Sequence, residues 1–193
     1  MFGQFWSRRT FLKASLAGAF ALFGGRAFAK ELIMPALPAR GGPGRPEGKL
    51  SLYNVHTDER LKVTYRDPWG AYDPGALSDL NYILRCHYTR EVKKMDIDVI
   101  EFLNAVDKSL SGGNEIHIIS GYRSPEYNDL LRREGRGVVK NSMHLSGKAI
   151  DISIPLVDMD VLRKTAVNLG YGGVGYYPKS GFLHIDSGRF RTW

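Results

Sequence analysis

Residues 142–154 read SMHLSGKAIDISI, and this stretch decides the fold. From residue 148 to residue 154 isoleucines alternate with other residues over the length of a strand, which predicts a buried β-strand. On such a strand Asp151 and Ser153 point to the face opposite the isoleucines. A carboxylate among buried aliphatic neighbours is costly unless a positive group meets it, and a metal ion would meet that need. The stretch therefore predicts a sheet with a polar site on one face.

The stretch 182–186, FLHID, repeats this pattern with His184 and Asp186 on one face. If it pairs antiparallel with the first strand, His184 lies beside Asp151. His144, at the end of the preceding loop, completes a set of two imidazoles and one carboxylate. Such a set suits one zinc ion per chain and leaves a fourth position for water, as in catalytic zinc sites. Taken singly, a histidine on a strand is more often a hydrogen-bonded core or surface residue, and a buried aspartate often pairs with an arginine.

The remaining histidines and the single cysteine give no second metal site. Cys86 and His87 are adjacent, but neighbours on a helix point about 100° apart and cannot chelate together. His117 on a predicted strand and His56 in a predicted turn have no matching partner, and both are interpreted as structural. One cysteine also excludes a disulfide scaffold and a cysteine-rich zinc module.

Periodicity and turn residues outside these stretches predict a single α+β domain with a mainly antiparallel sheet flanked by helices. Asp73 and Ser124, each followed by proline, indicate two helix starts. The expected elements are strands at 50–55 and 61–65, helices at 74–84 and 98–110, a strand at 115–119, a helix at 125–133, a basic loop at 135–143, a strand at 148–154, a helix at 159–169 and a hairpin of strands 173–177 and 182–186.

The net charge of the chain is +7, from 27 basic and 20 acidic residues. Residues 1–29 hold four of the basic residues and no acidic one, so that +3 remains for residues 30–193. This small charge and the lack of a recognition motif argue against a nucleic-acid partner.

The N-terminal region looks like an export signal. The run SRRTFLK at 7–13 resembles a twin-arginine signal, and Ala27-Phe28-Ala29 matches the pattern that a signal peptidase cuts after. The apolar stretch between them is too short for a permanent membrane span, although an uncleaved anchor is the alternative. We expect a signal peptide at 1–29, a Pro/Gly-rich linker at 30–48 and a folded domain at 49–193, exported to the periplasm by the twin-arginine machinery.

The pattern Ser142-x-His144-x-x-Gly147-x-Ala149-x-Asp151, with the later LHID, closely resembles the zinc metallopeptidases grouped with D-Ala-D-Ala carboxypeptidases, murein endopeptidases and the hedgehog domain. The stretches SGYRS at 120–124 and GGVGYYP at 172–178 are similar to the YcbK branch, murein endopeptidase K. The resemblance covers nearly the whole chain. It implies that residues 49–193 form a zinc peptidase domain with a hedgehog-like fold and that zinc is held by His144, Asp151 and His184.

The resemblance also implies roles for other residues. Arg123 would hold a substrate carboxylate or the oxyanion, the alternative being a structural salt bridge to Glu126 or Asp129. Carboxypeptidase relatives carry an acid three residues before the last histidine, where this chain has Gly181. Asp186 is then the candidate for the general base or for the acceptor that orients His184. Candidate substrate-binding residues are Ser142, Tyr176 and Tyr177, although two tyrosines on a strand are more often packing residues.

These features together predict a periplasmic zinc-dependent murein endopeptidase that hydrolyses peptide crosslinks of peptidoglycan in cell wall remodelling. The crosslink that is cleaved joins meso-diaminopimelate either to meso-diaminopimelate or to D-Ala. The sequence does not distinguish between these two bonds. The basic stretch 132–140 could attract their free carboxylates or be a solvated loop. The alternative function is a non-catalytic zinc-containing module that binds the cell wall or signals, which Gly181 keeps open.

Overall fold

The computed structural model describes residues 46–193. The predicted signal peptide and the linker up to residue 45 lie outside this part. Among the described residues, no helix combines the length and the apolar character that a membrane crossing requires.

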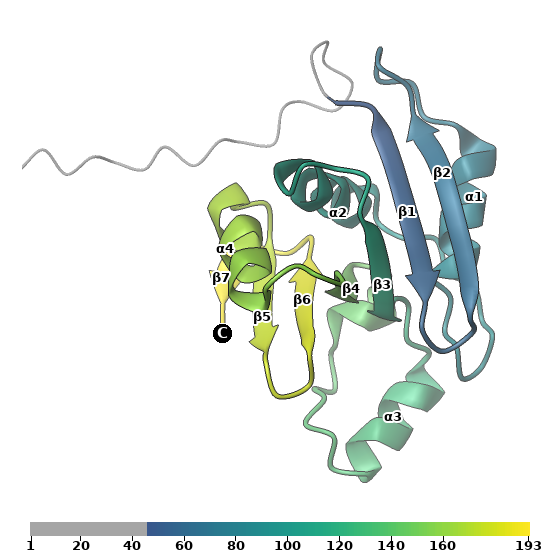
Figure 1. Cartoon of the computed structure of the whole chain (residues 1–193). Helices are drawn as coiled ribbons and strands as arrows, with labels where there is room; N and C mark the ends of the chain where they lie inside the picture. Colours follow the sequence, from purple (N-terminus) through teal and green to yellow (C-terminus); the bar gives the residue numbers. More distant parts are fainter. Residues whose placement is uncertain (1–45) are drawn as a thin grey trace, which may run out of the picture. The chain divides into compact units, whose positions relative to one another are not determined.

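One mixed sheet of seven strands forms the centre of the described domain, in the order β2-β1-β3-β4-β6-β5-β7 (Figure 1). Most neighbouring pairs are antiparallel, while β1 with β3 and β5 with β7 are parallel. The strands are β1 (Gly48–Asn54), β2 (Glu59–Arg66), β3 (Glu115–Ser120), β4 (Ala149–Ser153), β5 (Gly173–Tyr177), β6 (Phe182–Asp186) and β7 (Arg191–Thr192). The predicted α+β class with a mainly antiparallel sheet is confirmed, whereas β7 was not expected.

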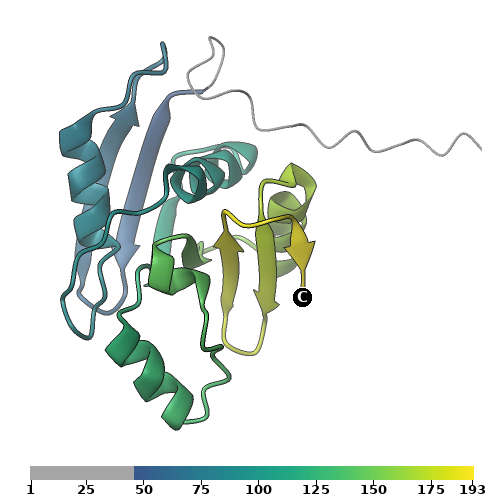
Figure 2. The same cartoon turned by 180° about the vertical axis from the view of Figure 1, so that it is seen from behind.

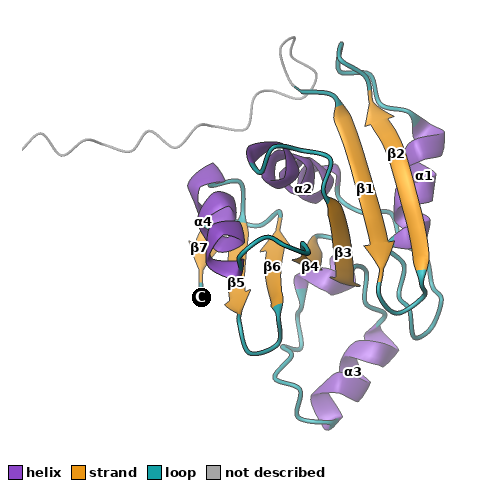
Figure 3. Ribbon diagram, viewed as in Figure 1, coloured by secondary structure: helices purple, strands orange, loops and turns teal. Residues whose placement is uncertain are grey.

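The helices are α1 (Pro74–Ile83), α2 (Ile97–Ser109), α3 (Pro125–Arg133) and α4 (Met159–Leu169), with a short 3-10 helix η1 (Met143–Ser146) before β4 (Figure 3). Their starts follow the predicted chemistry. The side chain of Asp73 accepts hydrogen bonds from two backbone amides of α1, and Ser124 caps α3 in the same way. Helix α2 starts one residue earlier than predicted, because Asp96 is its N-cap.

The hydrophobic core lies between one face of the sheet and three helices. Helix α1 packs on β2, α2 on β1 and β6, and α4 on β5 and β6. Alternation along β4 and β6 sends Ile150, Ile152, Leu183 and Ile185 into this core, where each is fully buried. The residues between them must therefore face the opposite side of the sheet.

That opposite face is covered near its centre by η1, which contacts β4. Helix α3 lies beyond the ends of the central strands in both views (Figures 1 and 2). The polar site predicted from the sequence is thus on the face that the three core helices leave open.

Candidate metal centre

Three buried polar side chains from three different elements meet on this face. His144 comes from η1, Asp151 from β4 and His184 from β6, and their residues are 3%, 5% and 9% exposed. The antiparallel register pairs Asp151 directly with His184, as predicted. Residues so far apart in the sequence are brought together by strand pairing and by the loop that returns η1 to β4.

The three donor atoms have the spacing of a zinc site. Nε2 of His144 lies 3.2 Å from Nδ1 of His184 and 3.3 Å from Oδ1 of Asp151. Nδ1 of His184 lies 2.8 Å from Oδ1 of Asp151. Two ligands at 2.0–2.1 Å from a tetrahedral zinc ion are about 3.3 Å apart. The cluster could therefore hold a metal ion through imidazole nitrogen and carboxylate oxygen, two of the donor types that zinc accepts.

His144 is oriented by its backbone surroundings. Its Nδ1 lies 2.7 Å from the carbonyl oxygen of Gly121, so this nitrogen donates and Nε2 is left for a metal. The hydroxyl of Ser142 accepts the backbone N–H of His144 at 3.3 Å and caps η1. Gly147 ends η1 with a left-handed φ of 65°, where a Cβ would also meet the carbonyl oxygen of Lys94.

His184 is held by carboxylates at both ring nitrogens. Its Nδ1 faces Asp151, and its Nε2 donates to Oδ2 of Asp186 at 3.1 Å. Burial alone would lower the pKa of His184, but the hydrogen bonds to the two carboxylates outweigh this and raise it. Burial would likewise raise the pKa of Asp151, yet the two imidazoles keep it below its usual range.

Asp186 is fully buried beneath His184 and is fixed by further contacts. Arg191 contacts both of its oxygens, with Nη2 at 2.7 Å from Oδ2 and Nη1 at 3.0 Å from Oδ1. The backbone N–H of Gly188 adds a hydrogen bond at 2.8 Å. Burial would raise the Asp186 pKa, but the hydrogen bonds from His184 and Arg191 lower it. The geometry makes Asp186 an acceptor for His184.

Arg123 points toward the cluster from the turn after β3. Its Nη2 lies 3.6 Å from Oδ2 of Asp151 and 3.4 Å from the hydroxyl of Ser120. Its Nη1 lies 3.5 Å from the side-chain oxygen of Asn128, while Nε has no hydrogen-bond partner although it is buried. Burial lowers the pKa of this guanidinium. Its partners are thus not Glu126 or Asp129, which the sequence offered as the structural alternative.

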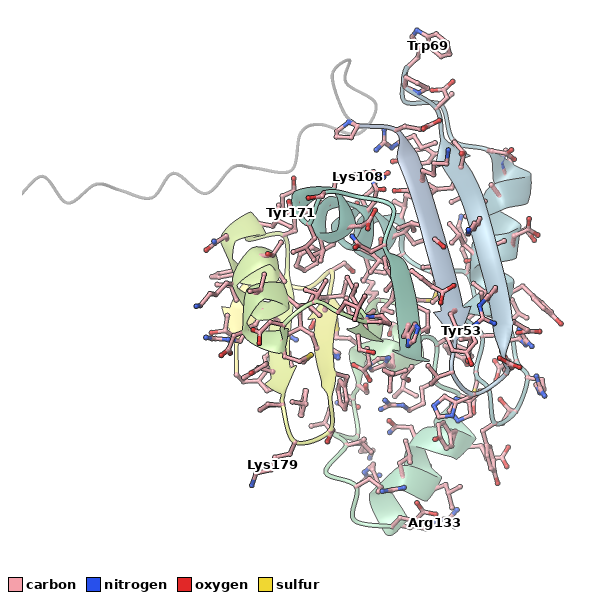
Figure 4. The ribbon with its side chains drawn as sticks, in the orientation of Figure 1. Tyr53, Trp69, Lys108, Arg133, Tyr171 and Lys179 are labelled. Atoms are coloured by element: carbon pink, nitrogen blue, oxygen red, sulfur yellow. The ribbon has the colours of Figure 1, made fainter. Side chains whose placement is uncertain are left out.

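A cavity of about 630 Å³ opens in front of the cluster. Asp151 is the only acidic residue among its described lining residues, whereas Arg123, Arg136 and Arg191 all line it. Two further exposed cations, Arg133 of α3 and Lys179 of the β5–β6 turn, project at the same end of the domain (Figure 4). The cavity is therefore suited to an anionic ligand.

Only one of the two candidate tyrosines reaches the cavity. Tyr177 lines it, and its hydroxyl accepts a hydrogen bond from Nε1 of Trp193 at 2.8 Å. Tyr176 faces the other side of β5, where its ring lies 5.2 Å from the guanidinium of Arg163 in α4. The alternation of side chains along a strand forces neighbours to opposite faces, so the structure does not bring Tyr176 to the site. Ser142 lines the cavity while it caps η1.

Among the lining residues to which sequence reasoning gave no role in the site are an aromatic and a cationic residue near the C-terminus and two histidines. Trp193 lies with its ring 5.4 Å from that of His184 and packs so closely over Gly175 that a Cβ there would meet it at 2.7 Å. Arg191 precedes it on β7. His56, predicted to be structural, and His87, excluded only as a metal ligand together with Cys86, stack on each other at 3.9 Å at another part of the lining. The glycine at position 175 fits the close packing of the tryptophan, and no spacing in the sequence indicates that His56 and His87 would stack.

Comparison with known proteins gives consistent matches over the described domain. The family model Peptidase_M15_2, described as peptidoglycan L,D-endopeptidase MepK, matches residues 45–193. The chain is 41% identical over 145 residues to "Probable peptidoglycan L,D-endopeptidase MepK" of Haemophilus influenzae, covering 75% of this chain and 77% of the relative. It is 38% identical over 144 residues to "Peptidoglycan L,D-endopeptidase MepK" of Escherichia coli K12, covering 75% and 79%.

Proposed function

The chain belongs to the Peptidase_M15_2 family of MepK-type endopeptidases, and from this premise we propose that it is a zinc-dependent endopeptidase that cleaves peptide crosslinks of peptidoglycan in the periplasm. The observation that carries the proposal is the convergence of His144, Asp151 and His184 at the floor of an open, cationic cavity. The names of its relatives, which are L,D-endopeptidases, favour the crosslink between two diaminopimelate residues over the D-Ala to diaminopimelate one.

His144, Asp151 and His184 would hold the zinc ion. The spacing of their donor atoms and the two oriented imidazoles support this assignment. When bound, the ion would supply Lewis-acid activation of water and of the scissile carbonyl. Three protein ligands leave room in the coordination sphere for these groups, which supports a catalytic rather than a structural metal.

The residues around the cluster would bind and orient the substrate. Arg123, almost fully buried and short of hydrogen-bond partners, would donate to a substrate carboxylate or to the developing oxyanion. Asp186 would keep the ring of His184 in place, a role favoured by its complete burial and its pairing with Arg191. Tyr177 and Trp193 would form one wall for the peptide.

The position of Gly181 bears on the general base. This residue lies in the β5–β6 turn with a φ of 71°, and an added Cβ would meet nothing within 4 Å. Among the lining residues from the described part of the chain, Asp151 is the only carboxylate. We therefore assign Asp186 the orienting role rather than that of the base.

The predicted export signal supports a periplasmic location. The SRRTFLK run and the Ala27-Phe28-Ala29 pattern favour transport of the folded protein by the twin-arginine route and removal of residues 1–29. Peptidoglycan is reached only outside the cytoplasm, so the target in the relatives' names agrees with this route.

A non-catalytic wall-binding or signalling module is the second candidate, and Gly181 in place of the usual acid favours it. The deciding experiment incubates the purified protein with crosslinked muropeptides, with zinc, with a chelator and as the His184→Ala variant. Loss of dimeric muropeptides only in the zinc-loaded wild type is the expected result. Intact dimers in the presence of stoichiometrically bound zinc would favour the binding module.

A further inference from the structure

A pair of stacked imidazoles forms one side of the cavity. His56, in the turn after β1, and His87, in the loop after α1, stack at 3.9 Å with an interplanar angle of 15°. The ring of Tyr127 in α3 meets His87 edge-on at 4.8 Å. Two side chains from separate elements, the turn after β1 and α3, thus pack against the His87 ring.

The two histidines differ in what their nitrogens contact. Nε2 of His56 lies 3.0 Å from the carbonyl oxygen of Ile119, so it donates there and anchors the pair to the end of β3. His87 makes ring contacts but has no hydrogen bond to another residue among 46–193, and it lines the cavity. Burial lowers the pKa of His87 to about 4, with His56, Arg123 and Arg90 adding to the effect. His87 is therefore a neutral imidazole with hydrogen-bonding capacity left for a ligand.

Positive charge gathers where His87 faces the cavity. Arg123 acts on His87 electrostatically, and its Nε is buried without a partner. Arg136 lines the same cavity, and Asp151, the sole carboxylate among the lining residues of the described part of the chain, belongs to the metal centre. His87 offers an N–H donor, and Arg123 has only long contacts, at 3.4–3.6 Å, to Ser120, Asn128 and the metal-centre residue Asp151, so the two side chains together form a site for a carboxylate.

We propose that His87 and Arg123 form a subsite for a free carboxylate of the substrate, with His56 and Tyr127 as positioning residues that hold His87. This inference rests on the proposed function, because it names a group of the same peptide substrate. Neither the family match nor the sequence motifs assign a role to the histidine pair.

The order of the strands sets the distance of the histidine pair from the metal centre, while Arg123, whose Nη2 lies 3.6 Å from Oδ2 of Asp151, is the part of the subsite nearer to that centre. His56 follows β1, and β1 and β4 are separated by β3, so they lie two strand spacings, on the order of 10 Å, apart. This distance corresponds to about three extended residues or to one long side chain. The distal carboxylate of a diaminopimelate side chain has such a reach, and we assign it to this subsite.

The test uses two matched ligand pairs that differ only at that carboxylate. The first is the uncleavable tripeptide L-Ala-γ-D-Glu-meso-diaminopimelate, with the distal carboxylate free or amidated. The second is the crosslinked dimer with the same change. The proteins are the zinc-loaded wild type, His87→Phe, which keeps ring packing but loses the hydrogen bond, and His87→Gln, which restores a donor. His117→Phe is the control, because His117 also makes an edge contact to a tyrosine but lies outside the cavity lining.

We expect the wild type to bind the free acid about ten-fold more tightly than the amide, in line with one lost hydrogen bond to a charged group. The His87 ring resonances should shift on binding, as followed by NMR. His87→Phe should lose the preference, with the change in turnover falling on KM, and His87→Gln should recover part of it. His117→Phe should behave as the wild type.

Equal binding of acid and amide by the wild type would overturn the subsite, and so would a preference that survives in His87→Phe. The outcome for the proposed function is separate. Turnover of both dimers without discrimination would leave the endopeptidase and remove the subsite. Tripeptide binding with the expected preference, but no turnover of any dimer, would leave the subsite and remove the endopeptidase. If His87→Phe does not fold, His87→Gln and the NMR shift of the wild type decide.

Discussion

His184 donates from Nε2 to the buried carboxylate of Asp186 at 3.1 Å, and this contact leaves Nδ1 as the nitrogen that faces Asp151. The tautomer needed for metal binding is thus set by an aspartate two residues along the same strand. Because Arg191 holds both oxygens of that aspartate, the orientation of His184 depends on β7 at the edge of the sheet.

Asp186→Asn should weaken zinc binding more than catalysis. The asparagine side chain lacks the negative charge that stabilises the proton on Nε2 of His184, and its amide N–H can point at the ring instead of accepting that proton. The tautomer that leaves Nδ1 free for the metal is then less favoured, so we expect zinc affinity to fall about 10- to 100-fold. Competition with a chelator measures the affinity, and turnover at saturating zinc should return close to that of the wild type. Asp79→Asn, at an exposed position of α1, is the control. Turnover that stays absent at saturating zinc would instead make Asp186 the base.

Gly121→Ala should destabilise the fold and the site together. A Cβ at this position would meet the carbonyl oxygen of Leu84, a backbone atom that cannot rotate away. We expect the free energy of unfolding in urea to fall by about 1–3 kcal/mol. Since the carbonyl oxygen of Gly121 also orients His144, zinc affinity should fall in the same variant. Unchanged stability would mean that the turn can move away from Leu84 at no cost.

Ser142→Ala separates a capping role from a substrate role. The hydroxyl caps η1, and loss of an N-cap costs about 1 kcal/mol. We expect that loss in urea unfolding, with the conservative Ser142→Thr retaining most of the stability. A rise in KM without any loss of stability would show that the hydroxyl contacts the substrate instead.

His87 should make the fold less stable in acid. Its pKa is about 4 in the folded chain and 6.5 as the reference value, so the unfolded chain binds a proton first as the pH falls. Stability from this residue is complete above pH 6.5 and is lost between 6.5 and 4, by on the order of 1–2 kcal/mol given its partial exposure. Urea unfolding from pH 7 to pH 4.5 should show a loss in the wild type that is smaller in His87→Phe. Parallel curves for the two proteins would contradict this.

The sequence predicted the parts of the site that depend on local pattern. Strand alternation placed Asp151 and His184 on one face, and antiparallel pairing placed them side by side, because both rules act within a few residues. The helix starts at Asp73 and Ser124 followed from capping chemistry in the same way.

The remaining parts depend on contacts between distant segments. The parallel pairing of β1 with β3 brings the turn that carries His56 next to the loop that carries His87, and no spacing in the sequence encodes that meeting. Trp193 reaches the cavity because the two-residue strand β7 pairs with β5, and two residues are too few for a pattern. The sequence motif contains both Tyr176 and Tyr177 but does not say which side of the sheet each one faces. The register of β5 decides that Tyr177 is the one that lines the cavity.

The three candidate ligands come from η1, β4 and β6, so their donor atoms meet only after β4 has paired with β6 and η1 has packed against β4. An unfolded chain has no such preformed site, and an ion that binds there would bind the native state alone. Occupancy and folding are then thermodynamically linked: at a thousand times its Kd the ion would add about 4 kcal/mol to the free energy of unfolding. The melting temperature measured at increasing zinc concentrations therefore reports zinc binding at this centre without any substrate.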